Sequence, residues 1–118
     1  MLPEPVGRIA ADAAGGIVGA IGTDDWDGVR EATADWFARF RPRDGERQRQ
    51  LARLDTTADA LSLAPDEELA RDAWTARWAE RLVYFLRDLA PPDRAEAVAA
   101  LRALWPSAAG EDGGPGRG

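Results

Sequence analysis

The sequence predicts an all-α protein, built as a small bundle of four to five helices. Every segment with a clear hydrophobic period repeats at three- and four-residue steps, as an amphipathic helix does. No segment alternates apolar and polar residues long enough to form a strand, and prolines and glycines separate the periodic segments. At 118 residues and 45% hydrophobic composition, the chain has the size of one domain that can bury a core.

The first helix is expected over about residues 5–21. Pro5 suits its first turn, and Gly22 suits the left-handed conformation that often follows a helix end. Three internal glycines each cost about 1 kcal/mol relative to alanine, so this helix depends on tertiary packing.

The second helix is expected to end near Phe40. We predict Asp24 as its cap, with Asp25 and Asp27 placing negative charge in the first turn, where the helix dipole favours it. Its apolar face at helical spacing consists of Trp26, Val29, Thr33, Trp36, Phe37 and Phe40.

Two further helices follow the second one. Asp44 is predicted to cap the third helix, whose regular apolar seam is typical of a packed helix pair and consists of Leu51, Leu54, Ala58 and Leu61. Pro65 and an acidic first turn beginning at Asp66 predict a fourth helix that reaches about Leu89. The inner face predicted for it consists of Leu69, Ala73, Ala76, Leu82, Phe85, Leu86 and Leu89, with Trp74 and Trp78 as a second row.

A fifth helix is expected to close the bundle. Two prolines followed by Asp93 predict its start, and Pro106 is expected to end it. Its inner face consists of Ala97, Val98, Leu101, Leu104 and Trp105. The helical domain is therefore expected to span residues 1–106, and residues 107–118, rich in glycine, proline and charge, predict a disordered tail.

The composition argues against an enzyme. All 15 basic residues are arginine, and histidine, lysine and cysteine are absent, so the usual proton-transfer groups and nucleophiles are missing. We predict no cofactor and no metal site, because helix capping explains the acidic cluster at residues 24–27 better than calcium binding does. A net charge of −6 argues against general nucleic-acid binding. The lack of cysteine and of a secretory signal pattern favours a cytoplasmic location.

Ala11, Gly15 and Gly19 form a row of small residues along the first helix. Such a row lets another helix approach closely, and the favoured interpretation is tight packing inside the bundle. Self-association or docking of a protein partner is the first alternative, and peripheral membrane contact is the second. We predict no transmembrane segment, because the apolar run is shorter than about 20 residues and contains Asp12.

Tryptophan and arginine are frequent at binding hot spots. A surface combining Trp74 or Trp78 with Arg71, Arg77 or Arg81 is therefore a second candidate interface. The alternative is that the indole rings fill the bundle and reach its edge with their N–H groups.

Six arginines lie in the segment from Arg39 to Arg53, against two acidic residues, which gives this segment a net charge of +4. The favoured interpretation is a solvated corner between two helices. The alternative is a site for an anion or an acidic partner that uses Arg43, Arg47 and Arg49.

The segment from Gly19 to Phe40, GAIGTDDWDGVREATADWFARF, resembles short uncharacterised actinobacterial proteins in which an Ala/Gly-rich helix leads into a helix ending in Trp-Phe-x-x-Phe-like aromatics. The resemblance implies a small helical adaptor and assigns no activity to any residue. The leading hypothesis is therefore a non-enzymatic protein–protein interaction module that binds a protein partner or a second copy of itself.

Overall fold

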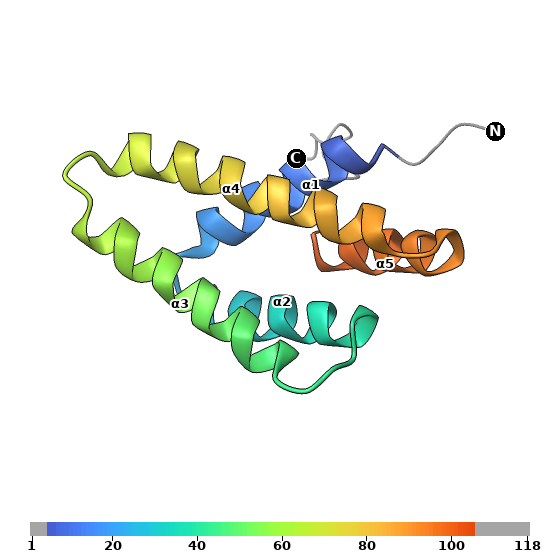
Figure 1. Cartoon of the computed structure of the whole chain (residues 1–118). Helices are drawn as coiled ribbons and strands as arrows, with labels where there is room; N and C mark the ends of the chain where they lie inside the picture. Colours follow the sequence, from blue (N-terminus) through green and yellow to red (C-terminus); the bar gives the residue numbers. More distant parts are fainter. Residues whose placement is uncertain (1–4, 106–118) are drawn as a thin grey trace.

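The computed structural model describes residues 5–105, which form five α-helices and no strand. They are α1 (Val6–Ala20), α2 (Trp26–Phe40), α3 (Glu46–Leu63), α4 (Glu67–Asp88) and α5 (Pro91–Leu104), shown in Figure 1. This confirms the all-α prediction and its five elements. The predicted helix end at Pro106 and the predicted tail at 107–118 lie outside the described residues.

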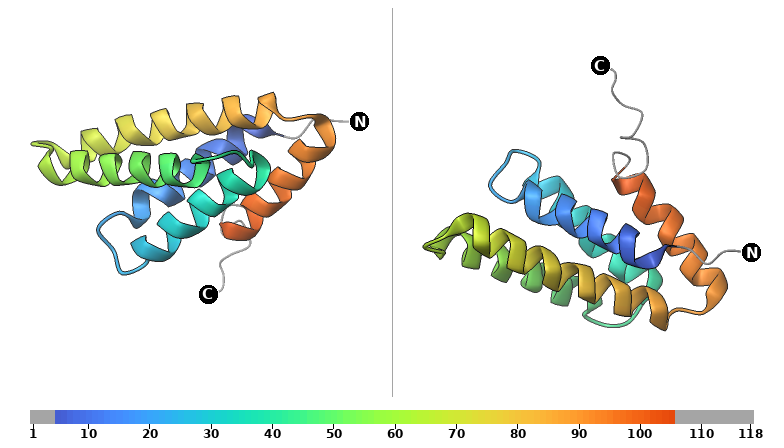
Figure 2. Two further views of the ribbon diagram at one scale, coloured as in Figure 1. Left: turned by 60° about the horizontal axis from the view of Figure 1, so that its bottom comes forward. Right: turned by 90° about the horizontal axis from the view of Figure 1, so that it is seen from above.

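The helices pack mainly as two pairs, with α1 lying along α4 and α2 lying along α3. A short turn after Leu63 joins α3 to α4, and the two helices diverge from this turn (Figure 1). Both views in Figure 2 show α5 at the other end of the bundle, beside the end of α4. The beginning of α3 and the end of α4 are therefore held apart, with the end of α2 close to both.

An aromatic cluster forms the centre of the core. The ring centroids of Phe37 and Phe85 lie 4.8 Å apart, and those of Trp36 and Phe85 lie 5.1 Å apart. The buried Trp36 and Trp78 both satisfy their indole N–H groups, at 3.0 Å from the Ala97 carbonyl and the Thr57 hydroxyl respectively. The other large buried residues come from α1, α3, α4 and α5 and include Ile9, Ile17, Leu51, Leu54, Leu61, Leu82, Leu86, Val98 and Leu101.

The predicted inner face of the fourth helix is wrong in its first half. Leu69 is 67% exposed, and Ala73 and Ala76 are also exposed. The half-buried Trp74 and the fully buried Trp78 face the core instead. Turning the helix this way buries two large indole rings at the expense of one leucine and two alanines, and so removes more apolar area from water.

The start of α2 also differs from the prediction. Asp24 does not cap the helix, which begins at Trp26 without a side-chain cap. The hydroxyl of Thr23 accepts a hydrogen bond from the Asp25 N–H at 3.2 Å, in the turn before the helix. Gly22 has a φ of +87°, which confirms the expected left-handed glycine after α1.

The third and fourth helices begin in different ways. Asp44 is not the cap of α3, because Gly45 precedes the helix with a left-handed φ of +79° and no side chain caps it. At this φ the glycine backbone itself turns the chain into the helix, without a hydrogen bond from a capping side chain. The start of α4 is as predicted, since the Asp66 carboxylate accepts a hydrogen bond from the Leu69 N–H at 3.1 Å.

Gly16 of α1 lies against the indole ring of Trp105, and a Cβ atom added at this glycine would overlap the ring. A Cβ atom added at Gly15 would meet nothing within 4 Å. We expect Gly16→Ala to lower the free energy of unfolding by about 1–3 kcal/mol, because Trp105 must move. Gly15→Ala should raise it by about 0.5–1 kcal/mol through better helix propensity. Urea unfolding checks both, and equal effects of the two variants would contradict the Trp105 contact.

Candidate anion-binding site

The small-residue row of α1 does not pack inside the bundle. Ala11, Gly15 and Gly19 are all exposed, so the favoured interpretation of this row is wrong. The opposite side of α1 is buried instead, because it carries the larger apolar side chains, among them Ile17 and Val18. Among residues 5–105, no helix combines the length and apolarity needed to cross a membrane.

The tryptophan–arginine surface is only partly present. Trp78 is fully buried, which agrees with the interpretation that the indoles fill the bundle, whereas Trp74 is half-buried. The guanidinium of Arg77 lies over the Trp74 ring at 4.7 Å, and that of Arg81 lies over Trp78 at 4.8 Å. Trp78 therefore cannot contact a partner without unfolding of the core around it.

Arg71, the third arginine predicted for that surface, is held by the first helix. Its guanidinium donates to the Val18 carbonyl at 2.6 Å and to the Ile21 carbonyl at 3.0 Å. These carbonyls lie at and just after the end of α1, where the Val18 carbonyl also accepts the backbone N–H of Ile21 at 3.2 Å. Arg71 thus joins α4 to the end of α1.

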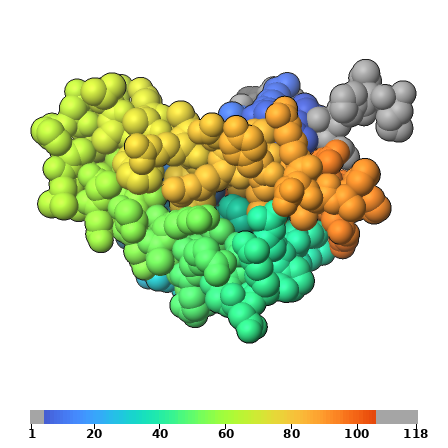
Figure 3. All heavy atoms as spheres, in the orientation of Figure 1, coloured from blue at the N-terminus to red at the C-terminus, as the bar shows by residue number. Residues whose placement is uncertain are grey.

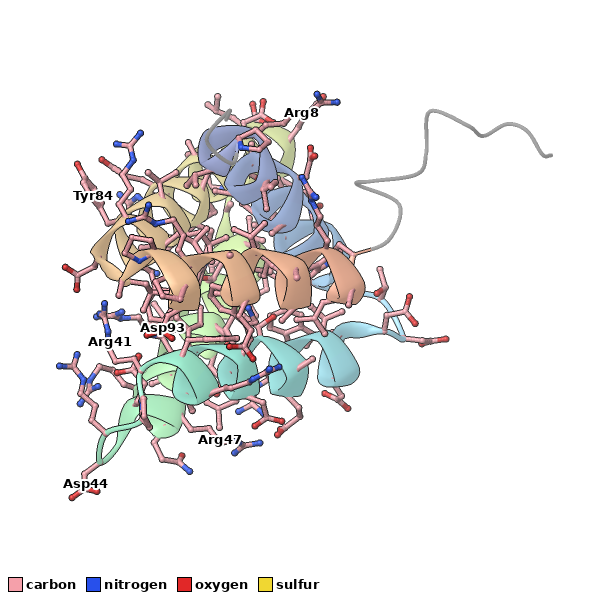
Figure 4. All side chains as sticks on the ribbon, turned by 90° about the vertical axis from the view of Figure 1, so that its right-hand side faces the viewer. Arg8, Arg41, Asp44, Arg47, Tyr84 and Asp93 are labelled. Carbon is pink, nitrogen blue, oxygen red and sulfur yellow. The ribbon has the colours of Figure 1, made fainter. Side chains whose placement is uncertain are left out.

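The three arginines predicted for an anion site do not gather in one place. Arg47 donates to Asp35 at 2.6 Å and also to Glu31, so it links α3 to α2. In Figure 4, Arg47 lies at the lower edge of the bundle, apart from Arg41 and Tyr84. Arg43 and Arg49 lie elsewhere, in a pocket that the sequence prediction identified only in part.

This pocket, which we call the arginine pocket, has a volume of about 410 Å³. It lies between the beginning of α3 and the end of α4. In Figure 3 the surface is hollowed between the residues of α4 (yellow to orange) and those of the α2–α3 corner (teal to green). The pocket is lined by Phe37, Arg41, Arg43, Glu46, Arg49, Gln50, Arg53, Arg81, Tyr84, Phe85 and Asp88. Five arginines thus share one pocket with two carboxylates.

Helical spacing explains how the chain builds this lining. Glu46, Arg49, Gln50 and Arg53 stand three or four residues apart, so they share one face of α3. The same spacing in the last turns of α4 places Arg81, Tyr84, Phe85 and Asp88 opposite them. The buried rings of Phe37 and Phe85, which touch edge to face, give the pocket a rigid apolar side.

The two carboxylates hold three of the five arginines. Glu46 is only 2% exposed and accepts hydrogen bonds from Arg43 at 3.2 Å and from Arg49 at 2.8 Å. Arg41 donates to Asp88 at 2.8 Å and lies over the Phe85 ring at 4.6 Å. These contacts fix part of the positive charge of the pocket.

Burial by itself would raise the pKa of Glu46, but hydrogen bonds from Gln50 and Arg43 and the charges of Arg43 and Arg49 lower the pKa overall. Because the pKa of Glu46 is lower in the folded state, its ionised carboxylate stabilises the fold at pH values above the ordinary pKa of 4.5. This stabilisation is lost as the pH falls through the lowered pKa. We therefore expect the free energy of unfolding to fall below about pH 4.5 and to fall less steeply in Glu46→Gln. Urea unfolding at several pH values measures both slopes, and parallel slopes would refute this role of Glu46.

The two remaining arginines have no such partner. Within residues 5–105, the guanidinium groups of Arg53 and Arg81 form no hydrogen bond or ion pair, and the Nη1 atom of Arg81 is buried. Burial lowers the pKa of Arg81, and the charges of Arg53 and Arg77 lower it further. The Oε1 atom of Gln50 is likewise buried without a donor. Within residues 5–105, the guanidinium N–H donors of Arg53 and Arg81 and the Oε1 acceptor of Gln50 thus have no hydrogen-bond partner.

Sequence reasoning found the basic segment but not the complete pocket. Arg41 and Arg53 lie in the segment that we flagged, but neither was assigned to the site, and Arg81 was assigned to a different surface. No local signal joins Arg81 to Gln50, since they belong to different helices and only the packing of α3 and α4 brings them to one pocket.

The geometry of the arginine pocket as a whole suits the binding of a negatively charged group.

No protein-family model, no curated protein and no solved structure matches this chain.

Proposed function

We propose that the chain is a non-enzymatic binding module whose arginine pocket holds an anion. The observation that carries the proposal is the excess of arginine in one pocket, where Arg81 has a buried Nη1 atom without an acceptor. Leaving a buried donor unpaired costs about 1–3 kcal/mol, and more for a charged group. A bound anion would remove that cost.

The electrostatics of the pocket support the same conclusion. The chain has a net charge of −6, yet the pocket lining has three more arginines than carboxylates. Arg53 and Arg81 repel one another, and an oxyanion between them would replace repulsion with two attractive contacts. The pocket also opens on the first turns of α3, where the helix dipole favours negative charge.

The residue types around the pocket favour binding over catalysis. Arginine stays protonated, so it can hold an anion but cannot transfer a proton. The chain contains no histidine, lysine or cysteine that could act beside it. We therefore propose that the pocket holds its ligand unchanged.

Isothermal titration calorimetry with inorganic phosphate as the probe tests this proposal. We expect binding that weakens as the salt concentration rises, and a loss of affinity of at least about tenfold in Arg81→Gln, because one charge-assisted contact is removed. Arg53 is exposed, so Arg53→Gln should weaken binding without disturbing the core.

The matched control is Arg87→Gln, which removes the same charge from an exposed position of α4 outside the pocket. This variant should bind phosphate like the original chain. Absence of binding by the original chain, or equal losses in Arg87→Gln and Arg53→Gln, would refute the anion site.

Association with a protein partner or with a second copy, the leading hypothesis from the sequence, stays a prediction. The exposure of Ala11, Gly15 and Gly19 favours it, because the row is open to contact. Size-exclusion chromatography with light scattering tests self-association, and a strict monomer at all concentrations would remove that form of the hypothesis.

A further inference from the structure

Gln50 lines the arginine pocket, and the direction of its side-chain amide is fixed. Its Nε2 atom donates to the Glu46 carboxylate at 2.8 Å. A carboxylate only accepts hydrogen bonds, so the NH₂ group and not the oxygen of the amide must face Glu46. The Oε1 atom therefore points elsewhere, and it is buried without a donor.

We propose that the arginine pocket selects a phosphate group, free or esterified, because such a group can carry its own proton beside its negatively charged oxygens. This inference rests on the proposed function. The arginines supply donors for the negatively charged oxygens, and Gln50 Oε1 supplies an acceptor for the P–O–H group. Sulfate and carboxylate ions at neutral pH have acceptor oxygens only, so one of their oxygens would face the Gln50 oxygen without a hydrogen between them.

In this proposal, a ligand reaches the buried atoms by displacing the more exposed arginines of the pocket. Gln50 is 3% exposed, whereas the side chains of Arg43 and Arg49 are 60% and 42% exposed. Both arginines are bound to Glu46 in the absence of ligand, and their long stems allow them to turn from Glu46 towards a phosphate group. Glu46 would then keep its hydrogen bond from Gln50, and the direction of the amide would be preserved.

The test compares inorganic phosphate with sulfate by titration calorimetry at about pH 6 and equal ionic strength, where inorganic phosphate keeps at least one proton, a phosphate monoester keeps one in about half of its molecules, and sulfate keeps none. We expect phosphate to bind at least about tenfold more tightly, because a site with a buried hydrogen-bonding group rejects a ligand that leaves it unpaired. Gln50→Met should lose most of this preference. The matched control, Gln48→Met, alters an exposed residue of the same helix and should keep it.

The outcomes separate this inference from the proposed function. Phosphate and sulfate binding equally well, both weakened in Arg53→Gln, would overturn the selection and leave the anion site intact. Binding of neither ion would remove both proposals. Tighter binding of an acidic peptide than of phosphate would overturn the phosphate assignment. Glycerol phosphate tests the source of the group: tighter binding than inorganic phosphate supports an ester, and weaker binding supports the free ion.

Urea unfolding of Gln50→Met shows whether the variant is folded. If it is not, a crystal structure of the original chain provides the second test. A Gln50 Oε1 atom that accepts a hydrogen bond from Arg81 in the free protein, and keeps it in phosphate solution, would overturn the inference. A Gln50 oxygen that faces a bound phosphate group would support it.

Discussion

Trp78→Ala is expected to lower the free energy of unfolding by about 3–5 kcal/mol, the range for removing a large aromatic side chain from a core. Trp78 is fully buried, packs against Phe37 with ring centroids 6.4 Å apart, and donates its indole N–H to Thr57 at 3.0 Å. The substitution leaves a cavity between α3 and α4 and removes one of two hydrogen bonds of the Thr57 hydroxyl, which keeps its bond to the Arg53 carbonyl at 2.9 Å. Since small domains have total stabilities of about 5–15 kcal/mol, this loss is a large part of the whole.

Trp74→Ala is the matched control for Trp78→Ala. Trp74 lies one turn earlier on the same helix and is only half-buried, with its ring covered by Arg77. We expect a loss of about 1 kcal/mol, in proportion to the smaller apolar area that it removes from water. Urea unfolding followed by circular dichroism measures both variants. A larger loss for Trp74→Ala than for Trp78→Ala would mean that the orientation of α4 described here is wrong.

Arg71→Gln should lower the free energy of unfolding by about 2–3 kcal/mol, because it removes two charge-assisted hydrogen bonds to buried or half-buried carbonyls. These are the bonds to Val18 and Ile21, and no other side chain donates to either carbonyl within residues 5–105. The arginine also places a positive charge at the end of α1, where the helix dipole favours it. Its loss should loosen the contact between α1 and α4.

The control for Arg71→Gln is Arg77→Gln, on the same helix. Within residues 5–105, Arg77 stacks on Trp74 and forms no hydrogen bond or ion pair, so its loss should cost less than about 1 kcal/mol. Hydrogen exchange gives a second readout, since the amides at the end of α1 should exchange faster in Arg71→Gln alone. Unchanged exchange there, together with equal stabilities of the two variants, would refute the capping role.

The faces of α2 and α3 were predictable because periodicity and side-chain size agree in them. In α5 the prediction is correct for Ala97, Val98 and Leu101 but wrong for Leu104, which is 37% exposed at the end of the helix. Leu51, Leu54 and Leu61 are buried as expected, and so are Trp36 and Phe37. In α4 two apolar stripes compete, and periodicity cannot show which of them faces the core. The choice depends on α2 and α3, because the buried Trp78 packs against Phe37 of α2 and donates its indole N–H to Thr57 of α3.

The helix starts illustrate a second limit of sequence reasoning. Both Asp24 and Asp44 are favourable cap residues, but the structure uses a threonine turn before α2 and a left-handed glycine before α3. Several local arrangements can start a helix at nearly equal free energy, so tertiary contacts decide among them. Asp66 caps α4 as predicted, in a turn that Pro65 restricts.

The arginine pocket shows why charge counting locates a segment but not a site. Consecutive arginines on a helix point in different directions, so Arg47 reaches α2 while Arg49 and Arg53 reach the pocket. Arg30 of α2 is also unavailable to a ligand, because its guanidinium donates two hydrogen bonds to the Asp55 carboxylate, at 2.7 Å and 2.9 Å. The arginines available to a ligand are those that the carboxylates of neighbouring helices do not reach, and only the packed structure reveals them.

Chemical-shift mapping tests the central claim most directly, that the arginine pocket is where this chain binds an anion. Backbone amides of the ¹⁵N-labelled chain are followed while inorganic phosphate is added at constant ionic strength. The account predicts saturable shifts that are largest at residues 41–53 and 81–88, which line the pocket, and negligible at residues 7–19. Shifts that never saturate, or that are largest along α1, would contradict it.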